Sequence, residues 1–345
     1  MNLPKEKIDF KDISVVVQGP IMGTINGKNE DRHTYLCLKS IRKFLPGATI
    51  ILSTWESADT TGLDYDFVIK SKDPGYYIIS DCVPGAIRND SSNRQIISTM
   101  AGLKLCKTKF SIKMRSDLIF KNSNFLKYYR KFSDLPFDEN YKLLKKRILA
   151  ITTVNPNRKF KHPFSMCDWF FFGLTEDLIN IFDVPLVSDK TLKGDKINNY
   201  YSITNNYSTE QYFWFSFISK YKKIPFNNFI DTTNNNIETS EKYFVNNCIL
   251  LSAWRAGIDC LKYPGASYAQ IPCLSYSGLY TYNDYKKMLN KYANNNLVIV
   301  PNLFEETVYF IVYNLRFYVK QKNPKIHDFI CKLVNPKNHK DKPKK

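Results

Sequence analysis

Two short, almost continuous apolar runs near the N-terminus constrain the fold more than any other feature of this chain. The first run spans Ile13–Val17 and is followed by a Gly-Pro pair, and the second spans Ala48–Thr54. Between them, residues 34–44 place apolar side chains at helical spacing, and a Pro-Gly pair stops that segment. Apolar runs of this length are typical of parallel strands that are buried on both faces. We therefore expect a strand–helix–strand unit with a parallel sheet.

The segments that follow extend this pattern. Residues 67–69 are apolar, and Ser91 opens a second segment with helical spacing. Phe110–Arg115 then alternates apolar and polar side chains, which is the period of a strand with one buried face. Neither Gly-x-Gly-x-x-Gly nor Gly-Lys-Ser/Thr occurs, which argues against dinucleotide oxidoreductases and P-loop enzymes. The expected fold class is α/β, a Rossmann-related, mixed and mostly parallel sheet flanked by helices.

Asp117 lies near the carboxyl end of the strand expected over Phe110–Asp117 and is the first candidate functional residue. Ligands bind at the carboxyl ends of the strands in open α/β sheets, so we expect this carboxylate at a binding site. A carboxylate there can hold Mn²⁺ or Mg²⁺, which in turn holds a diphosphate. Aspartates at strand ends also cap turns or pair with a neighbouring Arg or Lys, and this structural alternative stays open.

Composition indicates the cellular compartment in which this chain functions. A hydrophobic content of 43% over 345 residues suits a folded globular protein. No run approaches the roughly 20 apolar residues that span a bilayer, and the polar N-terminus has no signal-peptide core. The eight cysteines contain no Cys-x-x-Cys pair, so reduced thiols are expected instead of disulfides or a zinc site. These features predict a cytoplasmic protein.

The formal net charge of +18 indicates an anionic partner. Residues 316–345 hold ten Lys or Arg against two Asp, a local charge of +8, among apolar and aromatic side chains. Such a segment can lie on the anionic inner face of the cytoplasmic membrane, or it can be a solvated helix with a frayed tail. We expect residues 256–345 to form a helical, basic extension behind a domain of residues 1–255. The remaining basic residues form no stripe, so nucleic acid is not an expected partner.

A second acidic position lies among aromatic residues. Asp168 precedes Trp169 and three phenylalanines, and an apolar setting makes a carboxylate a better proton acceptor. The ring of Trp169 can stack on a sugar and so form an acceptor platform. Glu210 lies at a predicted helix start and is the second candidate base. The alternatives are a core strand led by a turn aspartate at Asp168 and a capping role for Glu210.

Seven short blocks occur in order between about residues 12 and 255. They are Val17–Ile21, Leu52–Trp55, Asp73–Gly75, Asn93–Thr99, Met114–Leu118, Asp168–Gly173 and Glu210–Tyr212. In order and spacing they resemble the WavE lipopolysaccharide-synthesis family. The resemblance implies a bacterial glycosyltransferase of the GT-A type, with an α/β domain that binds a nucleotide sugar. Such enzymes commonly hold a metal with Asp-x-Asp, where this chain has Arg115-Ser116-Asp117. Either Asp117 binds a metal alone, or Arg115 takes part of the cation's role.

A glycosyl transfer needs a nucleotide slot, positive charge for the diphosphate and a base for the acceptor hydroxyl. Gly19 permits close backbone approach, and Gln18 offers a donor and an acceptor to a base or ribose. Arg94 lies near its helix N-terminus, where anions bind. The alternatives are a strand-to-loop turn at Gln18 and a surface salt bridge at Arg94. The expected nucleotide-sugar ligands are Gln18, Gly19, Pro20, Asn93, Arg94, Gln95, Arg115 and Asp117.

The resulting hypothesis is a glycosyltransferase that extends a lipid-linked surface polysaccharide, lipopolysaccharide or capsule, at the inner face of the cytoplasmic membrane. Asp168 is the expected base and Glu210 the second choice. One base without a nucleophile pair favours an inverting mechanism. A sugar nucleotidyltransferase of similar fold is the alternative, although Gly23, Gly27 and Lys28 match poorly the basic, Gly-rich loop of that class. A basic nucleic-acid-binding protein is the third hypothesis.

Overall fold

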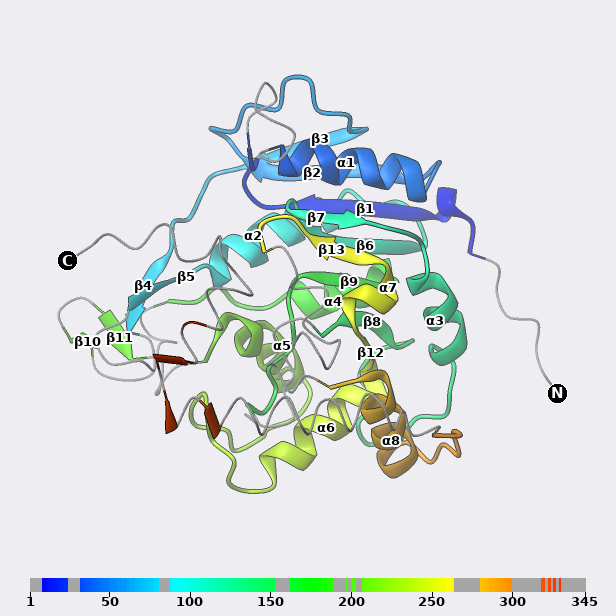
Figure 1. The fold of residues 1–345 in the computed structure, drawn as a ribbon, viewed down its shortest axis with the longest axis vertical. Coiled ribbons are helices and arrows are strands. Elements are labelled where there is room, and N and C mark those ends of the chain that lie inside the picture. The colour runs from blue at the N-terminus through cyan, green and yellow to red at the C-terminus, as the bar shows by residue number, and fades with distance from the viewer. Residues whose placement is uncertain are drawn as a thin grey trace.

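A seven-stranded sheet forms the centre of the fold (Figure 1). The computed structural model describes residues 8–23, 32–80, 87–152, 162–188, 196–197, 200–202, 207–263 and 280–299, with isolated positions between 318 and 329. The strand order across the sheet is β12-β8-β9-β6-β1-β2-β3. In that order the strands span Cys248–Leu251, Ile148–Ile151, Phe170–Leu174, Phe110–Arg115, Ile13–Gln18, Thr49–Trp55 and Phe67–Ser71.

The sheet is mixed and mostly parallel. Within the described residues β9 alone runs against its two neighbours, and the other pairs in the sheet are parallel. β1 and β2 flank α1 (His33–Phe44) in the chain, which confirms the expected strand–helix–strand unit. Every residue of β1 is buried because both faces of the sheet are covered. The predicted α/β class, a mostly parallel sheet flanked by helices, is confirmed.

The order of the strands reverses at β1. β2 and β3 follow on one side of β1, whereas β6 pairs with its other side. The register of the β1–β6 pair sets Gln18 opposite Arg115 at the carboxyl ends of both strands. A reversal of this kind leaves a crevice beyond the strand ends, and ligands bind there in open α/β sheets.

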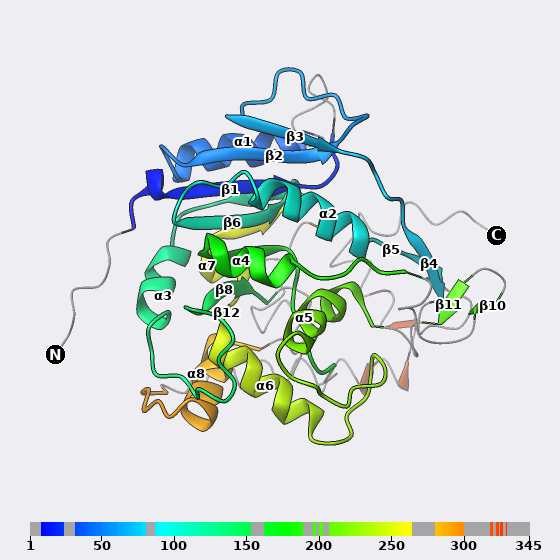
Figure 2. The same cartoon turned by 180° about the vertical axis from the view of Figure 1, so that it is seen from behind.

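Helices cover both faces of the sheet, as Figures 1 and 2 show from opposite sides. α1 lies on one face together with a two-stranded ribbon of β7 (Leu118–Phe120) and β13 (Ile258–Cys260). α2 (Ser92–Leu103) and α4 (Thr175–Phe182) lie on the other face. A Cβ at Gly102 would come within 2.3 Å of Val16 Cγ1, so α2 packs very closely on β1. The other helices are η1 (Phe10–Asp12), α3 (Phe125–Phe132), α5 (Thr209–Ser219), α6 (Asn236–Asn247), α7 (Ala253–Ala256) and α8 (Tyr282–Tyr292).

A smaller sheet stands beside the N-terminus of α2 (Figure 2). Its strand order is β10-β11-β4-β5, and these strands span Lys196–Ile197, Tyr200–Ser202, Tyr77–Ser80 and Ile87–Asp90. The carboxylate of Asp90 accepts hydrogen bonds from the backbone N–H of Ser92 and from the hydroxyl of Thr209. Asp90 therefore joins the N-termini of α2 and α5. The sequence patterns did not predict this sheet.

The aromatic stretch after Asp168 forms β9, which is the core-strand alternative for these residues. Phe170, Phe171 and Phe172 are fully buried. The ring of Phe172 meets the ring of Phe125 edge to face, with centroids 5.1 Å apart. Such interlocking rings fix β9 at the centre of the core.

The chain beyond the expected domain boundary at residue 255 packs against the part before it. β13 pairs with β7, and α8 packs against α6 and β12. Residues 316–345, the basic stretch expected to face a membrane, lie almost entirely outside the described residues. Among the described residues, no helix combines the length and the apolar character needed to cross a membrane.

Candidate functional site

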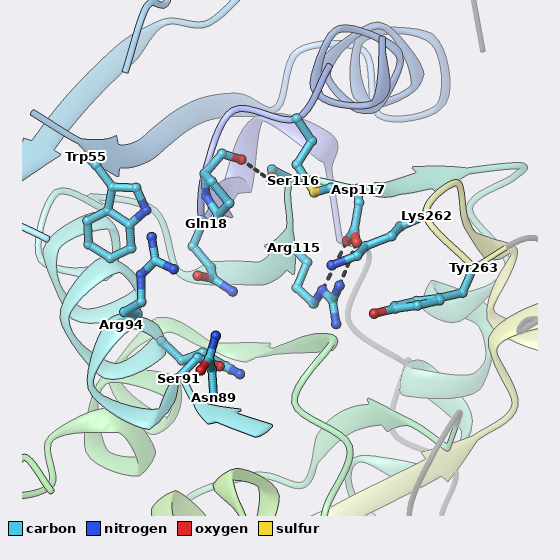
Figure 3. Close-up of a pocket in the computed structure, with 14 residues that line it drawn as sticks. Gln18, Trp55, Asn89, Ser91, Arg94, Arg115, Ser116, Asp117, Lys262 and Tyr263 are labelled. Atoms are coloured by element: carbon cyan, nitrogen blue, oxygen red, sulfur yellow. Dashed lines mark hydrogen bonds and ion pairs between the residues drawn. The ribbon is translucent and has the colours of Figure 1, made fainter. Parts of the chain in front are cut away.

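A pocket of about 380 Å³ lies beyond the carboxyl ends of β1, β2 and β6, where the strand order reverses (Figure 3). Eight residues were predicted from the sequence to bind the nucleotide sugar. Seven of them line this pocket, and the eighth, Asn93, does not. The lining residues are Gln18, Gly19, Pro20, Met22, Trp55, Asn89, Ser91, Arg94, Gln95, Arg115, Ser116, Asp117, Lys262 and Tyr263.

The exit of β1 forms one wall of the pocket. Gln18 is buried, and its Oε1 accepts a 2.7 Å hydrogen bond from the hydroxyl of Ser98 in α2. Gly19 has φ +116°, a conformation that favours glycine, and its N–H donates to the carbonyl of Ser53. The hydroxyl of Ser116 donates to the carbonyl of Pro20 over 2.7 Å. These bonds hold the exits of β1, β2 and β6 together and leave the amide of Gln18 pointing into the pocket (Figure 3).

Arg115 and Asp117 form a bidentate ion pair at the end of β6. Arg115 Nε lies 3.0 Å from Asp117 Oδ1, and Nη2 lies 2.6 Å from Oδ2. Asp117 is only 1% exposed, so its charge depends on this partner. The guanidinium lies 4.7 Å from the ring centroid of Trp169. Burial opposes the charge of Arg115, but nearby Asp117 and Asp168 outweigh burial and raise the pKa of Arg115 above its ordinary value. Asp117 therefore lines the binding pocket and also pairs with a neighbouring Arg.

Arg94 provides positive charge on the opposite wall. It is the third residue of α2, and its Nη2 lies 2.6 Å from Oδ2 of Asp73. The guanidinium is 5.1 Å from the ring centroid of Trp55. Arg94 Nε, Trp55 Nε1 and Gln95 Oε1 are buried and bond to no described residue. Buried polar atoms seldom lack partners in folded proteins, so these three atoms are available to a ligand.

Lys262 and Tyr263 complete the pocket and were missed by the sequence analysis. They follow β13, whose pairing with β7 continues in a hydrogen bond from the N–H of Leu261 to the carbonyl of Asp117 (2.9 Å). The ring of Tyr263 stacks on Trp169, with centroids 5.8 Å apart. No local motif marks these residues, because a pairing between distant segments brings them to the site.

Asn93 does not line the pocket, because its side-chain amide bonds to the backbone of Val187. Its Nδ2 donates to the carbonyl of Val187 over 2.8 Å, and its Oδ1 accepts from the N–H of Val187 over 2.7 Å. Both ends of the amide are therefore used to tie α2 to the segment after α4.

The two candidate bases also lie outside the pocket lining. Asp168 is 3% exposed, and its carbonyl accepts a hydrogen bond from the ammonium of Lys113. Trp169 is buried beneath Arg115 and Tyr263, so its ring supports the pocket from behind. Glu210 lies in the first turn of α5, whose N-terminus is capped by Ser208 and Gln211 in a capping box.

The geometry around Asp117 fits a divalent cation poorly. Both carboxylate oxygens accept hydrogen bonds from Arg115, whose positive charge lies where a metal ion would bind. Asp117 is the single carboxylate in the described lining. The described part of the chain gathers no group of three His, Cys, Asp or Glu that could hold a metal ion. This arrangement fits the alternative in which Arg115 takes part of the cation's role.

The pocket as a whole is positively charged. Its lining holds three cations, Arg94, Arg115 and Lys262, and one carboxylate, Asp117. Guanidinium groups bind phosphates through paired, charge-assisted hydrogen bonds. The residues present can therefore bind a ligand that carries negative charge and that also has planar polar groups at one end.

Lys113 gives a pH-dependent test of the packing behind the site. Burial lowers the pKa of this fully buried ammonium from 10.5 to about 8, although Asp168 nearby raises it. Between pH 8 and 10.5 the unfolded chain holds a proton that the folded chain has lost, so Lys113 adds stability as the pH rises. Relative to Lys113→Met, the free energy of unfolding should rise by roughly 3 kcal/mol across that range. Denaturant titrations of both proteins would measure the difference, and a constant difference would contradict the burial of a charged Lys113.

Comparison with known proteins identifies the family. Residues 13–301 match the family described as WavE lipopolysaccharide synthesis. No curated protein matches the chain. The 4-diphosphocytidyl-2C-methyl-D-erythritol synthase of Anaerococcus prevotii DSM 20548 is 11% identical with a TM-score of 0.33, over 68% of this chain and 99% of that chain. A cytidylyltransferase from Leptospira borgpetersenii serovar Hardjo-bovis (strain JB197) is 12% identical with a TM-score of 0.32, over 83% of this chain and 99% of that chain. Similarities this weak support no inference about activity. The family match spans most of the chain, and the chain belongs to the WavE lipopolysaccharide-synthesis family.

Proposed function

We propose that this protein is a glycosyltransferase that moves a sugar from a nucleoside-diphosphate donor to a growing bacterial surface polysaccharide, lipopolysaccharide or capsule. The pocket at the reversal of strand order carries the proposal, because its lining holds three cations, Arg94, Arg115 and Lys262, and one buried carboxylate, Asp117. Such a charge distribution suits a diphosphate. Membership of a lipopolysaccharide-synthesis family supports a sugar-containing substrate. A GT-A arrangement, with the donor at the strand ends and the acceptor beside it, is part of the proposal.

The nucleoside of the donor has partners near Arg94. The unpartnered atoms of Trp55, Arg94 and Gln95 comprise two N–H donors and an amide oxygen. The edge of a nucleobase carries acceptors and donors side by side and can complete these hydrogen bonds. The amide of Gln18 lies between Arg94 and Arg115 and can reach the ribose or the diphosphate (Figure 3).

In the proposed reaction an acceptor hydroxyl oxygen attacks the anomeric carbon of the donor sugar. A glycosidic C–O bond forms while the bond from that carbon to the diphosphate oxygen breaks. The nucleoside diphosphate leaves with the bonding electron pair, and the proton of the acceptor hydroxyl passes to a carboxylate base. A single displacement of this kind inverts the configuration of the anomeric carbon.

We propose Asp168 as the base, with Glu210 as the second choice. Asp168 lies close enough to Arg115 to raise the pKa of that guanidinium, and it precedes the Trp169 that supports Arg115. Asp168 lies outside the pocket lining and is 3% exposed, so binding of the acceptor must open a path to its carboxylate. Glu210 lies in the first turn of α5, outside the pocket lining.

The donor can be identified by thermal shift. Nucleoside-diphosphate sugars should raise the melting temperature of the protein more than the matching nucleoside monophosphates, because they bind the folded state through the diphosphate. The matching donor with a lipid-linked glycan should then release a nucleoside diphosphate. Release of pyrophosphate from a sugar phosphate and a nucleoside triphosphate would instead reveal nucleotidyl transfer and contradict the proposal.

The base can be tested with a pair of variants. Asp168→Asn should bind the donor as the wild type does but lose at least about 100-fold in turnover, which is the lower range for loss of a general base. Glu210→Gln is the matched control and should keep most of its turnover. The reverse pattern would assign the base to Glu210.

We propose that the reaction takes place at the inner face of the cytoplasmic membrane, with the basic residues 316–345 against anionic lipid. Phosphatidylglycerol vesicles should sediment with the protein at low ionic strength and release it at high ionic strength, because salt screens surface charge. A variant that ends before residue 316 is the control. Equal binding to uncharged vesicles would contradict the electrostatic attachment.

A further inference from the structure

We infer that Arg115 and Lys262 neutralise the donor diphosphate in place of a divalent cation, so that donor binding and transfer need no metal. This inference rests on the proposed function and concerns how the same pocket neutralises the negative charge of the donor diphosphate. It also assigns a substrate-contacting role to Lys262, which no sequence motif marks.

The fixed guanidinium of Arg115 carries the first part of the inference. Two of its five N–H donors point at Asp117, and the ion pair fixes the plane of the group. Trp169 lies 4.7 Å from the guanidinium carbon and Tyr263 lies 6.0 Å from it, both measured to the ring centroids. The side chain is 22% exposed, and Figure 3 shows one terminal nitrogen directed away from Asp117. Arg115 therefore presents its remaining donors to a ligand in one orientation.

The ammonium of Lys262 adds a second charge beside the first. Figure 3 shows this side chain reaching toward Asp117 and Arg115 from the segment after β13. Lys262 forms no ion pair with any described residue, whereas Lys121 on the same ribbon pairs with Asp259 over 3.7 Å. The pairing of β13 with β7 fixes the backbone at Leu261, one residue away. Lys262 thus supplies a positive charge that Asp117 does not cancel.

The charges around Asp117 explain why donor binding and transfer need no divalent cation. Asp117 and Arg115 cancel each other, so the end of the pocket nearest β6 keeps the charge of Lys262 and the free donors of Arg115. When the donor bond breaks, negative charge develops on the departing diphosphate, and these fixed groups stabilise it without rearranging. A divalent cation at Asp117 would have to displace the guanidinium or lie against it, and the two positive charges would repel.

Calorimetric titration with uridine, guanosine, cytidine and adenosine diphosphate, each in EDTA and in excess Mn²⁺, tests the inference. The nucleoside diphosphate that binds should have the same Kd in both buffers within about twofold. Lys262→Ala should weaken binding roughly tenfold in EDTA, the loss of one charge-assisted hydrogen bond. Lys121→Ala, which removes a neighbouring lysine outside the pocket, should leave the Kd unchanged.

Arg115→Asp supplies the sharpest comparison, because it places two carboxylates where the wild type has an ion pair. This variant should bind the nucleoside diphosphate poorly in EDTA and recover when Mn²⁺ is added. Wild-type binding that appears only with Mn²⁺ would overturn the inference and leave the proposed function intact. Binding in neither buffer would overturn the proposed function together with the inference. If Arg115→Asp fails to fold, the wild-type titrations in EDTA and in Mn²⁺ still decide between these outcomes, and Lys262→Ala tests the role of Lys262.

Discussion

The ion pair between Arg115 and Asp117 is the interaction on which the site depends. A carboxylate as deeply buried as Asp117 needs a partner, and the chain supplies one two residues earlier. The same two residues are tied to three other parts of the molecule. Arg115 is in register with Gln18 of β1, its N–H donates to the carbonyl of Trp169, and the carbonyl of Asp117 accepts from Leu261. The two residues of this charge pair therefore lie where β1, the start of β9 and the β7–β13 ribbon meet.

The sheet explains why this meeting point is a pocket. β1 and β6 are adjacent and parallel although two helices, two further strands of the sheet and two strands of the smaller sheet separate them in sequence. The chain leaves their carboxyl ends in different directions, and the space between the exits stays open. α2 brings Arg94 to one side of that space, and the ribbon brings Lys262 to the other side. The positive charge of the pocket thus comes from three separate segments that the topology draws together.

Local sequence patterns predicted the strands that are buried along their length. The apolar runs of β1 and β2 are buried on both faces, and the exits at Gln18 and Asp117 follow directly from the strand ends. Asn93 shows where such reasoning stops, because only tertiary packing decides which residue in the first turn of α2 faces the pocket. Sequence patterns did not reveal Lys262 and Tyr263 for a similar reason. A ribbon that pairs segments far apart in the chain brings these two residues to the pocket. Asp168 and Trp169 were expected to serve as base and as acceptor platform; the aromatic run that follows them forms the buried strand β9, and both residues lie outside the pocket lining.

A crystal structure of the protein with the nucleoside diphosphate that binds it most tightly would show whether this pocket binds an activated sugar through its diphosphate. We expect phosphate oxygens within hydrogen-bonding distance of Arg115 and Lys262, with the nucleobase near Trp55 and Gln95. A nucleotide bound elsewhere on the molecule, or bound here with its phosphates turned away from Arg115, would contradict this expectation.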